Sequence, residues 1–159
     1  STMAPLSIPV IEEKITRIIA LTAHHTELAR TAQNNEETFG DLAVESETKT
    51  EYFMATYPQL KNAYNSYVAL YNAGRLHPTA LNAFMLLVQY HFDAETKNTE
   101  AYERIIALEG HYDIEHHRHD NILSDLELHH IVFLAAKDEL RLRERGVSNT
   151  PLQDVILDD

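Results

Sequence analysis

Residues 11–39 read IEEKITRIIALTAHHTELARTAQNNEETF, and this stretch decides the fold class. Every third or fourth position forms a row that is apolar at its start and polar in its middle. This heptad pattern is typical of a helix that packs against other helices. Ser7 is suited to cap the helix start, and Pro9 stands where a missing backbone N–H costs nothing. We call this row the seam and expect its first positions to form an interface: Ile11, Ile15, Ile18, Thr22 and His25.

The four glycines of the chain are spaced almost evenly. They are Gly40, Gly74, Gly110 and Gly146. Glycine is favoured just after a helix C-terminus, because it adopts the left-handed conformation without a Cβ clash. The spacing predicts four helical segments, each one long helix or two shorter ones. We expect Pro58 to break the second segment and His77-Pro78-Thr79 to open the third.

The fourth segment carries a helix-start signal. Ser124 and Glu127 form a capping box, which predicts a helix over residues 125–145. The expected fold is therefore all-α: an antiparallel bundle of four long, or five to six shorter, helices. Residues 3–146 form one domain in this interpretation, and residues 147–159 form a flexible acidic tail. The glycine period of about 35 residues also fits a solenoid of helix pairs, although the motif of such repeats does not recur.

Composition narrows the possible partners. The 159 residues include 13 basic and 25 acidic side chains, a net charge of −12 with histidine neutral. An acidic chain repels phosphate, so we expect neither nucleic acid nor anionic membrane as a partner. Cysteine is absent, which excludes disulfides and thiolate metal sites. With no secretory signal and no long apolar run, a cytoplasmic protein is expected.

The densest cluster of chemically versatile side chains lies in residues 111–120. Imidazole and carboxylate groups bind Zn, Fe or Mn where thiolates are absent. Residues four apart share a helix face, so one face would carry the histidines at 111 and 119 and the glutamate between them. The alternative is a solvated connecting segment without a ligand. The candidate metal ligands are His111, Glu115, His116, His119 and Asp120.

Other histidines and tyrosines fall on apolar helix faces. His25 and His91 are expected to be core histidines, hydrogen-bonded to a neighbouring carbonyl or carboxylate. A row of tyrosines is expected to be core with exposed hydroxyl edges, or alternatively an interface. These tyrosines are Tyr52, Tyr57, Tyr64, Tyr67 and Tyr71.

No motif for phosphate, dinucleotide or acyl chemistry is present. The leading hypothesis is a non-enzymatic helical scaffold that binds a protein partner or itself as a homo-oligomer, without a cofactor. The alternative is a metal-binding bundle, with or without a catalytic role, centred on residues 111–120. A third hypothesis is a pH-responsive assembly, because protonation of ten histidines would remove much of the negative charge.

Overall fold

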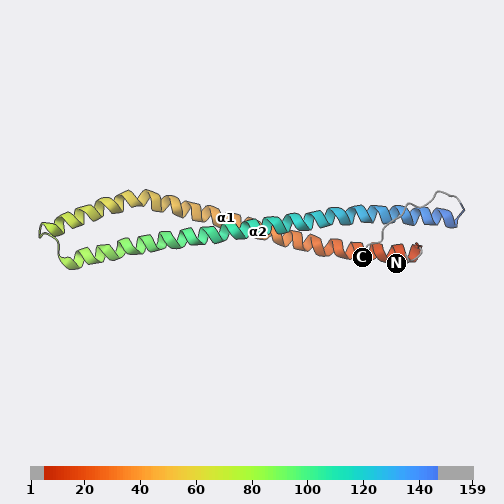
Figure 1. The fold of residues 1–159 in the computed structure, drawn as a ribbon, viewed down its shortest axis with the longest axis horizontal. Coiled ribbons are helices and arrows are strands. Elements are labelled where there is room, and N and C mark those ends of the chain that lie inside the picture. Colours follow the sequence, from red (N-terminus) through yellow and green to blue (C-terminus); the bar gives the residue numbers. More distant parts are fainter. Residues whose placement is uncertain (1–5, 147–159) are drawn as a thin grey trace, which may run out of the picture. The chain divides into compact units, whose positions relative to one another are not determined.

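A computed structural model describes residues 6–146 and shows two long α-helices joined by a short turn (Figure 1). Helix α1 spans Ile8–Asn72, 65 residues, and α2 spans Pro78–Glu144, 67 residues. No strand occurs among the described residues. The all-α class is confirmed. The expectation of four or more helices is wrong for residues 6–146, which form two.

Both helices begin where the sequence predicts. The backbone N–H of Ile11 donates to the Ser7 carbonyl at 3.0 Å, so Ser7 occupies the N-cap position of α1 and Pro9 lies in its first turn. At the start of α2, the backbone N–H of Thr79 donates to His77 Nδ1 at 3.1 Å. The His77 side chain thus satisfies one of the backbone donors that a helix N-terminus leaves without a partner.

The turn between the helices is built around Gly74. Its φ is +72°, in the left-handed region, as a glycine after a helix C-terminus adopts. The Gly74 N–H donates to the Tyr71 carbonyl at 3.0 Å, and the Arg75 N–H donates to the Leu70 carbonyl at 2.8 Å. This pair of bonds is a Schellman motif. Gly146 (φ +68°) ends α2 in a similar way, so two predicted helix ends are confirmed.

The other predicted breaks are wrong. Gly40, Pro58 and Gly110 all lie inside continuous helix, and Ser124 lies in the middle of α2 rather than at a helix start. A glycine in a helix interior costs only about 1 kcal/mol relative to alanine. An interior proline costs about 3 kcal/mol. Both helices continue through these positions in spite of the two costs, whereas a positive φ at Gly74 ends α1.

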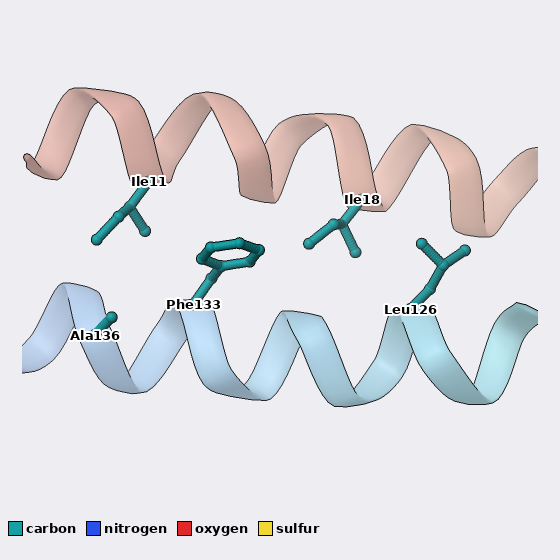
Figure 2. Packing of buried hydrophobic residues seen from close by; sticks show 5 residues of the cluster. All are labelled: Ile11, Ile18, Leu126, Phe133 and Ala136. Atoms are coloured by element: carbon teal, nitrogen blue, oxygen red, sulfur yellow. The ribbon is translucent and has the colours of Figure 1, made fainter. Parts of the chain in front are cut away.

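Contacts divide the chain into two compact units. The first contains Ser1–Gln33 and Asp113–Asp159, of which residues 6–33 and 113–146 are described. Here α1 and α2 run antiparallel and share an apolar core (Figure 2). Ile11 is fully buried, and each such side chain removed from water contributes about 1.5–3 kcal/mol. The core consists of Ile11, Ile18, Leu126, Phe133 and Ala136.

The second unit, Asn34–Tyr112, is a helical hairpin that contains the turn. Its helices meet through rings and polar side chains. Phe39 stacks on Tyr112 with 5.7 Å between ring centroids, and the Ser46 hydroxyl donates to Asn98 Oδ1 at 2.9 Å. Ala43 and Ser46 are buried here, but no residue from 52 to 92 is buried. The part of the hairpin nearest the turn therefore lacks a closed core.

The structure does not test the predicted domain boundaries or the predicted C-terminal tail. A single domain over residues 3–146 stays a prediction, because the two units are each defined by their own contacts. The acidic tail over residues 147–159 lies outside the described residues.

Candidate functional site

Two of the predicted metal ligands, Glu115 and His119, share one stripe of α2 as the spacing indicates. His119 Nε2 lies 3.7 Å from Glu115 Oε2, and both side chains are largely covered. The other oxygen of Glu115 accepts a hydrogen bond from Arg118 Nη1 at 2.8 Å. His111, the third member of the predicted stripe, is exposed, and its ring lies edge-on to Tyr112.

The remaining histidines of the cluster pair with carboxylates one turn away on the same helix. His116 Nε2 lies 3.1 Å from Asp120 Oδ2, and His117 Nδ1 lies 3.3 Å from Asp113 Oδ1. Among residues 6–146, no three histidine or carboxylate side chains are arranged to hold a metal ion. The metal site therefore stays a prediction from spacing.

The structure instead joins His119 to a residue of α1. His25 Nδ1 and His119 Nδ1 are 2.9 Å apart, so one ring nitrogen donates a hydrogen bond and the other accepts it. Burial lowers the pKa of His25, and the nearby His119 and His24 lower it further. A hydrogen bond between two imidazoles requires that at least one facing nitrogen carry no proton. The sequence pattern assigns His25 to the seam and His119 to the candidate metal ligands, whereas the structure joins the two side chains in one contact.

The five seam residues predicted as an interface face α2 of the same chain. Ile11 and Ile18 belong to the core, and Ile15 packs against it. Thr22 and His25 are partly buried in the same row. The seam thus forms the packing surface between α1 and α2, and an intermolecular role for it is not needed to cover these side chains.

His91 differs from the expected core histidine. Its ring lies edge-on to Phe53 with 5.1 Å between centroids. Its Nε2 is buried without a hydrogen-bond partner among the described residues, so the predicted bond to a carbonyl or carboxylate is not formed.

The largest concentration of exposed apolar side chains lies around the turn. We call residues 52–92 the tip segment. It holds 11 of the 23 large hydrophobic side chains that are exposed among residues 6–146. It contains no aspartate or glutamate, although the chain has 25 acidic residues. The sequence pattern identified five of the tyrosines but not the other exposed side chains Met54, Met85, Leu86, Tyr90 and Phe92. The absence of acidic residues from this segment is the signal that could have found them.

A shallow acidic groove adjoins the tip segment. Glu47, Thr50 and Glu51 line it from α1, and Thr99 and Tyr102 line it from α2. The Tyr102 hydroxyl donates to Glu47 Oε1 at 3.0 Å. This bond raises the pKa of Tyr102, and burial and the negative charges of Glu47 and Glu109 raise it further. The groove holds two carboxylates and no basic side chain, which suits it to bind a cation.

Comparison with models of protein families, with curated proteins and with solved structures found no match. Neither helix has a segment long and apolar enough to cross a membrane within residues 6–146.

Proposed function

We propose that the protein is a non-enzymatic interaction module that binds a protein surface through its tip segment. The observation that carries this proposal is the concentration of exposed apolar side chains over residues 52–92, where no residue is buried. Contiguous exposed apolar surface on a protein is typical of a binding site. The helical hairpin holds these side chains in place before a partner arrives, which lowers the entropic cost of binding.

The chemistry of the tip segment supports binding to protein. Six of the eight tyrosines of the chain lie in it. Tyrosine and other aromatic residues are enriched at binding surfaces because each combines a large apolar area with a polar end. The segment has only two charged residues, Lys61 and Arg75. Low charge reduces the desolvation cost of covering it.

Binding through the tip segment could form a bundle between chains, which differs from the bundle within one chain that the glycine spacing predicts. One hairpin supplies two helices, and a partner that contributes two more would complete an antiparallel four-helix bundle. In this proposal the bundle is formed between chains rather than within one chain, and the heptad pattern continues to serve as the packing surface inside each hairpin.

Site-specific photo-crosslinking in cells that express the protein tests the proposal. A photoreactive amino acid replaces Met54 in the tip segment, and in a control variant it replaces Leu128 of the first unit. These side chains are 69% and 59% exposed, so the positions are matched in access to solvent. We expect a discrete cross-linked product from position 54 and none from position 128. Equal yields from both positions, or no product from position 54, would contradict the proposal.

A further inference from the structure

We propose that the partner is a second copy of this chain: two tip segments pack face to face and antiparallel, and Arg75 of each copy enters the acidic groove of the other. This inference rests on the proposed function and names its partner. Three features of the molecule support this pairing: one apolar face on the tip segment, the position of the groove beside that face, and the distribution of charge along the chain.

The apolar face follows from heptad spacing. Tyr57, Tyr64 and Tyr71 are seven residues apart on α1, so they lie on one side of it. Met85 and Phe92 are seven apart on α2. The rings of Tyr57 and Phe92 meet edge-on at 6.2 Å, which joins the two rows into one surface. We call this surface the tip face; its members are all exposed, and they are Met54, Tyr57, Tyr64, Tyr71, Met85 and Phe92.

The acidic groove continues the tip face away from the turn. Residues 47, 50, 54 and 57 follow one another at steps of three and four, so they lie on one stripe of α1. Glu47 and Thr50 line the groove, and Met54 and Tyr57 begin the tip face. At the opposite end of the same segment, exposed Arg75 stands in the turn. An apolar surface thus has carboxylates at one end and a guanidinium at the other.

This arrangement is self-complementary under a two-fold axis. When two tip faces lie antiparallel, the turn of one copy reaches the groove of the other, and the reverse contact forms at the other end. The distance from Glu51 to the end of α1 is about 30 Å at 1.5 Å per residue. Each copy would place one guanidinium beside Glu47 and Glu51 of its partner, a charge-assisted contact.

Charge distribution favours this arrangement over a parallel or full-length pairing. Two of the 13 basic residues lie in the tip segment, which leaves 11 basic against 25 acidic residues elsewhere. Overlap limited to the tip segments keeps the acidic parts of the two copies from packing against each other. A parallel pairing would instead bring like charges together along the whole length, which costs stability.

The exposed apolar area of the tip face sets the size of the contact. Its six side chains are 39–69% exposed and, at about 200 Å² for a full side chain, present on the order of 500 Å² of surface. A standard interface takes about 800 Å² from each partner. The tip face therefore corresponds to a small, reversible dimer contact, to which the two Arg75 contacts at its ends add.

A charge exchange between two variants tests the inference. In Arg75→Glu, the new carboxylate in the turn of each copy would face the carboxylates of the acidic groove. In Glu51→Arg, the new guanidinium in the groove would face the guanidinium of Arg75. We expect each variant alone to dimerise at least roughly tenfold more weakly than wild type in sedimentation velocity, because symmetry places each change in two contacts. An equimolar mixture should regain dimerisation, because both ends of the mixed dimer then pair opposite charges.

Arg141→Glu is the matched control, because it makes the same charge change at an exposed position of the first unit. It should dimerise as wild type does. Failure of the mixture to recover would overturn the antiparallel arrangement. A second outcome would overturn the choice of partner: the wild-type chain stays monomeric at concentrations well above that in the expressing cells, while position 54 still cross-links to a different protein. The proposed function would then still hold.

Discussion

At the residue scale, the contact between His25 and His119 shows how a polar pair lies in the seam between buried apolar residues. Ile18 and Leu126 are buried on the seam near this pair, and Ala29 is buried one turn further along α1. The two rings satisfy each other through the 2.9 Å hydrogen bond, so neither facing nitrogen is left without a partner. If both facing nitrogens carried a proton, this hydrogen bond would have no acceptor.

The stability of the first unit should therefore fall in mild acid. Because folding lowers the pKa of His25, the unfolded chain binds this proton more readily than the folded chain. The contribution to the free energy of unfolding is present above the ordinary pKa of 6.5 and is lost as the pH falls through the folded-state pKa. Urea unfolding of wild type at pH 7.5 and 5.5 measures the loss.

His25→Gln separates this effect from the other histidines. Glutamine can still donate a hydrogen bond to His119, but it does not titrate. The variant should lose less stability than wild type between the two pH values. His129→Gln, at an exposed position of α2, should behave as wild type. The same pH dependence in wild type and His25→Gln would show that His25 is not the group responsible.

A contact within one helix could be predicted from the sequence, whereas a contact between the two helices could not. Spacing alone places Glu115 and His119 on one stripe, because that relation lies within α2. The partner of His119 is 94 residues away in the sequence, and no local pattern encodes that distance. The heptad spacing correctly placed His25 on the seam of α1. The residue that it contacts depends on the register between α1 and α2, which the spacing within one helix does not give.

At the element scale, the same residue type ends a helix at one position and continues it at another. Gly74 has a φ of +72° and ends α1, whereas Gly110 lies inside α2. The sequence predicted the seam, the starts at Ser7 and His77, and the end at Gly74. It could not tell which glycines adopt a positive φ, because that depends on whether packing against the opposite helix continues past the glycine.

A pair of alanine substitutions tests this contrast. A Cβ at Gly110 meets nothing within 4 Å, so Gly110→Ala should stabilise the chain by about 1 kcal/mol through helix propensity. Gly74→Ala should destabilise it by about 1–2 kcal/mol, because alanine is strained at a left-handed φ. Thermal unfolding followed by circular dichroism compares the two. Changes of the same sign would contradict the structural assignment of the glycines.

At the scale of the whole molecule, the acidic residues lie apart from the segment in which exposed apolar side chains are most concentrated. The tip segment is free of acidic residues, and the buried apolar cluster lies in the first unit. The average composition of the whole chain does not show this separation, because its charge and hydrophobic content are those of an ordinary acidic globular protein. It emerges only when charge is counted segment by segment and compared with burial.

Native mass spectrometry of the intact protein distinguishes the proposed module from a metalloprotein. We expect dimers without a stoichiometric metal ion, and an unfolding temperature that EDTA leaves unchanged, because no three ligands converge among residues 6–146. An integer number of metal ions per chain that survives desalting, and is lost in His119→Ala, would favour the metal site instead.

The Schellman turn at Gly74 also has a consequence for the order of folding. Contacts between α1 and α2 span longer stretches of chain the further they lie from the turn: 52 residues for Ser46 with Asn98, and 94 for His25 with His119. The entropic cost of closing a loop rises with its length, so contacts nearest the turn form at the lowest cost. We expect the contacts between α1 and α2 to form in order, starting next to Gly74 and proceeding away from it. The buried side chains around Ile11 and Phe133 would then meet last, although they stabilise the fold most.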